Sequence, residues 1–164
     1  MKNTDWIDPK DPDERYRVLY AQMEALLGGE EDPVANLANA AALLNGALPN
    51  INWVGFYRMK DGGLVLGPFQ GKPACLRIAV GRGVCGTAVQ TGKTQLVPDV
   101  NRFPGHIACD AESASELAIP FRSGEKTVGV LDIDSPIPDR FTDPDARALE
   151  KIAELIGRSC RWTE

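Results

Sequence analysis

The order in which the hydrophobic periodicity changes along this chain is the strongest constraint on its fold. Apolar residues recur at helical spacing over residues 12–27 and again over residues 33–48, with a pair of glycines between the two segments. Between residues 51 and 135, segments rich in aromatic and β-branched residues alternate with a period of two, and residues 143–159 return to a helical stripe. We therefore expect two helices, an antiparallel sheet and a closing helix in one α+β domain.

Short turns separate several of the expected strands, which favours hairpins. Residues 61–63 join the first two strands, and residues 123–125 join the last two. Residues 81–86 form a glycine-rich turn into a short helix predicted over residues 87–91. Residues 98–114 form a loop that is long for a compact domain, and loops of this length are usually functional. The predicted strands are 51–59, 64–67, 76–80, 95–97, 116–121 and 126–135.

Composition and charge exclude several classes of protein. The chain has 164 residues, enough for one domain with its own core, and its 43% apolar and 25% charged residues are ordinary for a globular protein. Its formal net charge of −5 argues against a nucleic-acid partner. The first residues contain no apolar signal-peptide core, and no apolar run approaches the length of a membrane span. We expect a cytoplasmic protein with a polar arm at residues 1–11 and one domain at residues 12–160.

Three of the four cysteines lie within one 35-residue stretch, with the spacing C-x9-C-x23-C. Cytoplasmic thiols stay reduced unless they cycle, so Cys75, Cys85 and Cys109 are candidates for redox chemistry, whereas Cys160 is most simply incidental. Cys85 stands at the start of a predicted helix, whose dipole lowers the pKa of a thiol. Asp110 would raise the pKa of the neighbouring Cys109 thiol. Local electrostatics therefore favour Cys85 at least as much as Cys109 as the thiolate.

A metal site is the alternative explanation for the cysteines. Cys75, Cys85 and Cys109 with His106 would make a Cys3His zinc site. The spacing lacks the C-x2-C pair that pre-forms half of such a site, so we predict no bound metal. We also expect no bound cofactor. His106 is the one histidine of the chain, and by itself it fits a loop hydrogen bond as well as catalysis.

Carboxylates occupy strand positions where burial would be costly. Glu116 begins one predicted strand, while Asp132 and Asp134 are two residues apart and share a face of another. They form either a solvent-facing edge or an acidic pocket that binds an ammonium group or supplies a proton. Trp53 and Tyr57 also share a strand face, either as core residues or as the wall of a pocket for a small apolar or sulfur-containing ligand.

Six long motifs occur in order between residues 52 and 136. They are NWVGFY (52–57), GPFQGKPAC (67–75), GVCG (83–86), FPGHIACD (103–110), SE (115–116) and GVLDIDSP (129–136). Together they resemble the free methionine-(R)-sulfoxide reductases, which are stand-alone GAF-domain enzymes, and the resemblance extends over residues 12–157. It implies a GAF domain with a roughly six-stranded antiparallel β-sheet, flanked by N-terminal and C-terminal helices and commonly found as a homodimer.

The resemblance also implies roles for individual residues. The catalytic cysteine of the family falls on Cys109, and its two other cysteines fall on Cys75 and Cys85, of which Cys75 is the preferred resolving partner. The acidic substrate contacts fall on Glu116, Asp132 and Asp134, and the aromatic contacts fall on Trp53 and Tyr57.

The implied reaction is the reduction of free L-methionine (R)-S-oxide to L-methionine. Cys109 would attack the sulfoxide sulfur while Glu116 or Asp134 protonates the oxygen. The sulfenic acid on Cys109 would then condense with Cys75, and thioredoxin would restore both thiols as an external reductant. The competing hypothesis is a non-catalytic GAF domain that senses a small molecule, which would not need three thiols in this pattern.

Overall fold

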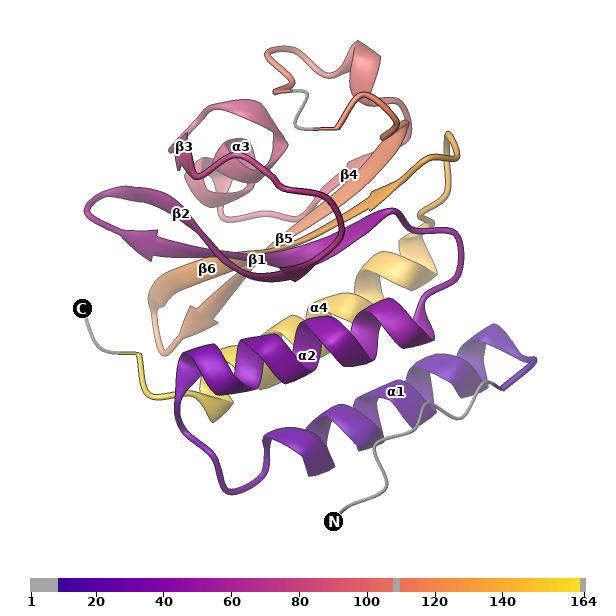
Figure 1. Ribbon diagram of the computed structural model, residues 1–164, viewed down its shortest axis with the longest axis vertical. Coiled ribbons are helices and arrows are strands. Elements are labelled where there is room, and N and C mark those ends of the chain that lie inside the picture. Colours follow the sequence, from indigo (N-terminus) through magenta and orange to yellow (C-terminus); the bar gives the residue numbers. More distant parts are fainter. Residues whose placement is uncertain (1–8, 108–109, 163–164) are drawn as a thin grey trace.

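A computed structural model describes residues 9–107 and 110–162 of the chain. Within these residues, four α-helices and six strands follow the order expected from the sequence (Figure 1). The helices are α1 (Pro12–Leu27), α2 (Pro33–Ala47), α3 (Gly83–Thr91) and α4 (Asp143–Ser159), and a short 3-10 helix, η1 (Val100–Arg102), interrupts the long loop. The strands are β1 (Trp53–Lys60), β2 (Gly63–Gln70), β3 (Arg77–Ala79), β4 (Gln95–Val97), β5 (Ser115–Ser123) and β6 (Lys126–Ser135).

Side-chain caps fix where three of the helices begin. The carboxylates of Asp11 and Asp32 each accept a hydrogen bond, 2.9 Å long, from the backbone N–H three residues later, and a proline follows each aspartate. At the start of α4, Thr142 and Asp145 form a reciprocal capping box. Caps of this kind stabilise a helix by about 1 kcal/mol each, so the local sequence determines these boundaries.

The six strands form one antiparallel sheet in the order β3-β2-β1-β6-β5-β4. Helices α2 and α4 cover one face of this sheet, and α1 packs outside them (Figure 1). Helix α3 and the long loop lie over the opposite face. No helix in the described part of the chain is long and apolar enough to cross a membrane.

The period-two pattern of the central strands divides the interior into two clusters. On β1, Val54 and Phe56 pack with the helices α1, α2 and α4, whereas Trp53 and Tyr57 pack on the other side of the sheet with α3. The same alternation on β6 directs Leu131 and Ile133 to the helices and Val130 to the α3 side. One face of the sheet therefore carries most of the apolar core and leaves the other face for a site.

Helix α3 departs from the sequence prediction, because it begins at Gly83 rather than at Thr87. Glycine lowers intrinsic helix propensity, so the segment 83–86 reads as a turn in isolation. Packing against β3 favours the helix instead: a Cβ atom on Gly86 would lie 2.4 Å from the carbonyl oxygen of Ala79. The carbonyl of Gly86 also accepts a hydrogen bond of 2.8 Å from the N–H of Gly81.

Candidate active site

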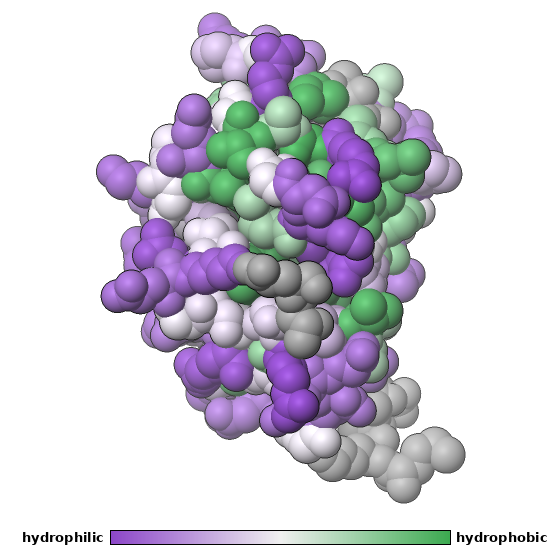
Figure 2. Space-filling model, turned by 90° about the vertical axis from the view of Figure 1, so that its left-hand side faces the viewer, coloured by the Kyte–Doolittle hydropathy of each residue, from purple (hydrophilic) through white to green (hydrophobic). Residues whose placement is uncertain are grey.

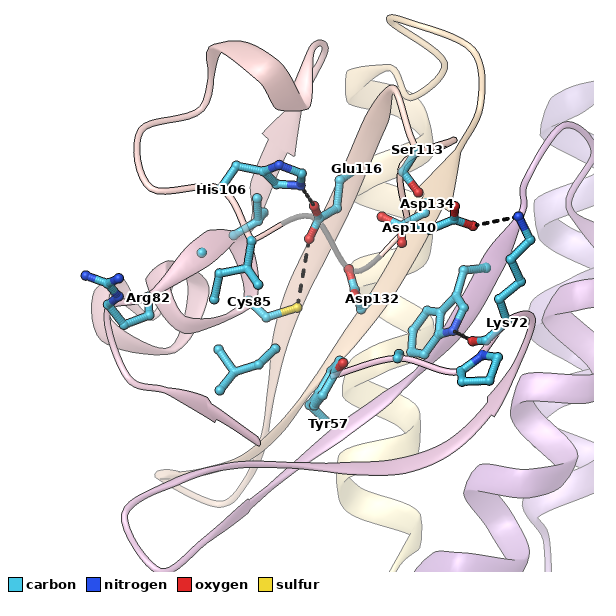
Figure 3. A pocket seen from close by; sticks show the side chains of 17 residues that line it. Tyr57, Lys72, Arg82, Cys85, His106, Asp110, Ser113, Glu116, Asp132 and Asp134 are labelled. Carbon is cyan, nitrogen blue, oxygen red and sulfur yellow. Dashed lines mark hydrogen bonds and ion pairs between the residues drawn. The ribbon is translucent and has the colours of Figure 1, made fainter. Parts of the chain in front are cut away.

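A pocket opens on the sheet face that α3 covers, between α3, the segment after β2 and the long loop (Figure 3). It brings together six of the residues predicted from the sequence: Trp53, Tyr57, Cys85, Glu116, Asp132 and Asp134. The remaining polar side chains of its lining are Lys72, Arg82, His106, Asp110 and Ser113.

Strand register places the three carboxyl groups side by side. Asp134 on β6 pairs with Trp53 on β1 and with Glu116 on β5, so these residues form a row across three strands. Asp132 lies two residues earlier on the same face and pairs with Gly55 and with an alanine, two small neighbours that leave space above the sheet. Because β6 lies in the middle of the sheet, these aspartates are not on a solvent-facing edge.

Burial raises the pKa of each carboxyl group in this cluster. Glu116 and Asp132 are each 7% exposed. Burial raises the pKa of Glu116 well above its ordinary value, and the nearby carboxylates of Asp132 and Asp134 raise it further. Burial also raises the pKa of Asp134, with added repulsion from Asp132 and Asp110. For Asp132, burial raises the pKa to about 6, although hydrogen bonding to Glu116 and Cys85 offsets part of the effect.

An aromatic wall forms the side of the pocket next to the carboxyl groups. The ring of Trp53 stacks on Tyr57 at 6.1 Å and on Phe69 at 5.3 Å between centroids. The indole N–H of Trp53 donates to the carbonyl of Lys72, and the hydroxyl of Tyr57 donates to the carbonyl of Cys75, both at 3.0 Å. The wall therefore also fixes the backbone that carries Cys75.

The environment of Cys85 contradicts the expectation from local electrostatics. Cys85 lies in the first turn of α3, but it is only 3% exposed, and its Sγ lies 4.0 Å from Oε1 of Glu116. Burial raises the pKa of the Cys85 thiol well above its ordinary value, and the charges of Asp132 and Glu116 raise it further. The lowered pKa expected for Cys85 from its place at a helix start is therefore wrong, while its ranking against Cys109 stays a prediction.

His106 lies against Glu116 from the loop side of the pocket. Its Nε2 is 3.7 Å from Oε2 of Glu116, a separation that would count as an ion pair if the imidazole were protonated. Burial lowers the pKa of His106, however, and raises the pKa of Glu116. Both shifts favour the uncharged forms of the two groups, which disfavours an ion pair between His106 and Glu116.

The cysteines differ in oxidation state. Cys75 is disulfide-bonded, whereas Cys85 and Cys160 are free thiols. Cys109, the predicted attacking residue, lies outside the described residues, and its role stays a prediction. A disulfide-bonded Cys75 offers no thiolate to a metal, so the Cys3His zinc site considered from the sequence is not formed in this state.

Polar residues that the sequence did not single out connect the long loop to the segment after β2. Lys72 Nζ lies 3.6 Å from Asp110 Oδ2 and 2.6 Å from Glu112 Oε2. Asn52 Nδ2 donates to Ser113 Oγ at 3.1 Å and to Asp110 at 3.3 Å. The N–H of Glu112 and then Lys72 hold the pKa of Asp110 below its usual value. The sequence feature that could have indicated these ion pairs is the position of Lys72 within the GPFQGKPAC motif. A single lysine, however, does not predict an ion pair with a distant loop.

Comparison with known proteins identifies the family. The model of the GAF domain family matches residues 32–160. The free methionine-R-sulfoxide reductase of Escherichia coli (strain K12) is 52% identical over 151 residues, which is 92% of this chain and 92% of that protein. The chain belongs to the free methionine-(R)-sulfoxide reductase family. Its GAF fold and its α+β class are therefore as the sequence predicted.

Solved structures of free methionine-(R)-sulfoxide reductases have the same fold. The reduced form of fRMsr from Staphylococcus aureus superposes with a TM-score of 0.88 at 48% identity, over 96% of this chain and 99% of that one. The Neisseria meningitidis free methionine-R-sulfoxide reductase, solved in complex with its substrate, gives a TM-score of 0.90 at 42% identity, over 94% and 93% of the two chains. The family model begins within the turn before α2, so a domain boundary at residue 12 stays a prediction.

Proposed function

We propose that this protein reduces free L-methionine (R)-S-oxide to L-methionine. The observation that carries the proposal is the cluster of Glu116, Asp132 and Asp134 beside an aromatic wall, in which burial raises the pKa of each carboxyl group. The wall also fixes the backbone that carries the disulfide-bonded Cys75. A relative that is 52% identical carries the name of this activity, which supports the same substrate for this chain.

The charge of the pocket explains why a free amino acid would be selected. A free methionine sulfoxide brings an ammonium group, which favours the ionised form of a carboxyl group within a few ångströms. We assign this contact to Asp132 and Asp134, because they share one face of β6 at the pocket. A methionine residue inside a peptide offers no such charge. The rings of Trp53 and Tyr57 would contact the S-methyl end of the substrate.

Glu116 is the proposed general acid. The sulfoxide oxygen leaves the sulfur only when it receives a proton, and a carboxylic acid can donate one at neutral pH only if its pKa is raised. Burial and two neighbouring carboxylates raise the pKa of Glu116 in this way. Asp134, whose pKa is raised by burial and by Asp132 and Asp110, is the alternative donor.

The proposed cysteine chemistry balances in three steps. The Cys109 thiolate attacks the sulfoxide sulfur, the oxygen takes a proton, and the hydroxyl passes to Cys109, which releases methionine and leaves a sulfenic acid. The Cys75 thiol then displaces water from this sulfenic acid and forms a disulfide. An external dithiol exchanges with that disulfide, becomes oxidised and returns both cysteines to thiols. The disulfide at Cys75 and the free thiol at Cys85 support Cys75 as the resolving residue.

Thioredoxin is the proposed reductant, and the surface next to Cys75 is suited to a protein partner. Leu76 is 74% exposed, and Val80 and Ile107 are also exposed large apolar residues. Figure 2 shows hydrophobic surface gathered in the upper half of the face that lies on the left of Figure 1, where β2, β3 and α3 lie. A docked reductant would cover this surface while its thiolate reaches Cys75.

Single-turnover assays of cysteine variants test the proposal. The reduced protein is mixed with free L-methionine (R)-S-oxide without thioredoxin, and methionine is quantified. Cys109→Ser should release no methionine, while Cys75→Ser should still complete one turnover, because the resolving thiol acts only after methionine has left. One turnover retained in Cys109→Ser and lost in Cys85→Ser would refute the assignment of the attacking residue.

Thiol titration separates an enzyme from a GAF domain that only senses a small molecule. Addition of the free sulfoxide to the reduced protein should remove about two thiols per chain through disulfide formation. A sensor would bind without losing any. The homodimer implied by family resemblance is a separate prediction, which light scattering of the purified protein checks.

A further inference from the structure

Three donor atoms of different chemistry meet on the floor of the pocket. The Sγ of Cys85, one carboxylate oxygen of Glu116 and one of Asp132 all lie within 4.8 Å of one another. Figure 3 shows the three side chains pointing toward one another from α3, β5 and β6. A tetrahedral ion with a sulfur ligand at about 2.3 Å and an oxygen ligand at about 2.0 Å separates the two donors by about 3.5 Å. The 4.0 Å between Cys85 Sγ and Glu116 Oε1 therefore needs only a small contraction.

The unsatisfied oxygen of Asp132 points to a missing partner at this position. Asp132 is 93% buried, and in the described part of the chain its Oδ1 has no hydrogen-bond partner. A buried carboxylate oxygen without a partner costs free energy comparable to a lost hydrogen bond. A bound cation would satisfy this oxygen and the Cys85 sulfur together.

The charge balance around these donors also favours a cation. Asp134 adds a third carboxyl group to the pocket lining beside these donors, and His106 Nε2 lies 3.7 Å from Oε2 of Glu116. The remaining basic side chains of the pocket lining are Lys72 and Arg82. Lys72 is paired with two carboxylates of the loop.

From this geometry we propose that Cys85, Glu116 and Asp132 form a binding site for a divalent d-block cation of borderline softness, such as Zn²⁺. The thiolate supplies the soft donor and the two carboxylates supply hard donors, a mixture that zinc accepts. The fourth coordination position faces the pocket and is filled by water. The site differs from the Cys3His arrangement because it uses neither Cys75 nor His106.

The cation would act as an inhibitor of the proposed reductase. It occupies the carboxyl groups that would otherwise bind the substrate ammonium and protonate the sulfoxide, so cation and substrate exclude each other. Binding displaces protons from the thiol and the carboxyl groups, so the affinity falls as the pH is lowered. The cation site is nevertheless independent of the proposed reaction, because its three donors are present whether or not the chain reduces a sulfoxide.

Titration with Co²⁺ tests the site by spectroscopy, without relying on activity. Protein in which the Cys75 disulfide is formed is titrated with CoCl2, and thiolate-to-cobalt charge transfer is recorded in the near ultraviolet. Wild-type protein should bind Co²⁺ in equimolar amount with this band. Cys160→Ser is the matched control, because Cys160 is also a free buried thiol and lies beside Asn36, away from the pocket. This control should behave as wild type.

Two variants decide the assignment. Cys85→Ser should lose the charge-transfer band, because its hydroxyl replaces the thiolate. Asp132→Asn keeps the thiol and the shape of the side chain, and it should weaken Co²⁺ binding at least about tenfold through loss of one anionic ligand. Absence of the band in wild-type protein, its survival in Cys85→Ser, its loss in Cys160→Ser, or undiminished affinity in Asp132→Asn would each overturn the proposal.

Discussion

Replacement of Asp132 by asparagine should make the protein more stable at neutral pH. Burial raises the pKa of Asp132 from 3.8 to about 6, so the folded state holds this proton more tightly than the unfolded state. Between pH 4 and pH 6 the folded protein therefore binds more protons at this position, and the free energy of unfolding falls as the pH rises through that window. About one pH unit above the folded-state pKa the loss is nearly complete.

The magnitude follows from the size of the shift. A rise of about two pKa units corresponds to about 3 kcal/mol, because each unit represents 1.36 kcal/mol. Asparagine has nearly the same shape and does not ionise, so Asp132→Asn avoids this loss. The variant should match the wild type near pH 4 and exceed it by about 3 kcal/mol at pH 7.5. In a domain of this size the difference corresponds to a rise in Tm of about 6–12 °C.

Urea denaturation followed by tryptophan fluorescence measures this difference. Both proteins are unfolded at pH 4, 5, 6 and 7.5 in the same oxidation state. Glu125→Gln is the matched control, since Glu125 is exposed in the turn between β5 and β6 and its replacement should change stability little. A difference that stays constant with pH, or an Asp132→Asn variant less stable than wild type at pH 7.5, would refute the reasoning.

Three further changes test other parts of the pocket. Glu116→Gln should slow single-turnover methionine release by about 10²- to 10⁴-fold, because an amide cannot act as the acid, and rapid-quench kinetics at pH 7 measures the rate. In the wild type the same rate should fall as the pH rises through the raised pKa of Glu116. Lys72→Met should leave the unfolding free energy nearly unchanged, because the Lys72 side chain is exposed, yet it should speed amide hydrogen exchange over residues 110–113. Leu76→Ser should raise the KM for thioredoxin and leave the single-turnover rate unchanged, because Leu76 is an exposed apolar residue next to Cys75. An unchanged KM for thioredoxin would contradict this prediction.

Local signals in the sequence predicted most of the fold. The boundaries of α1 and α4 came from periodicity and from residues such as Pro12, and the structure gives the same limits. The start of α3 could not be predicted in this way. Its helical first turn depends on the close approach of Gly86 to the backbone of Ala79, which is a tertiary contact.

Part of the pocket lining could be predicted from the sequence, but its electrostatics could not. The spacing of Asp132 and Asp134 placed both on one face of a strand, but only the central position of β6 showed that this face is covered. For Cys85 the nearest sequence feature was a helix start, while the groups that determine its pKa come from β5 and β6. Glu116 is 31 residues away in the chain, so no local pattern reports its effect.

The division of β1, β5 and β6 between two faces has a consequence for protein engineering. Neighbouring positions on one strand serve different purposes: Ile133 packs against the helices, while Asp132 and Asp134 face the pocket. A library that randomises only pocket-facing positions should leave the helix-side core intact and yield many folded members. The same number of changes on the alternate positions should yield few. New ligand specificities should therefore be sought first at the polar pocket-facing positions, because Trp53 and Tyr57 on that face also pack in the second interior cluster.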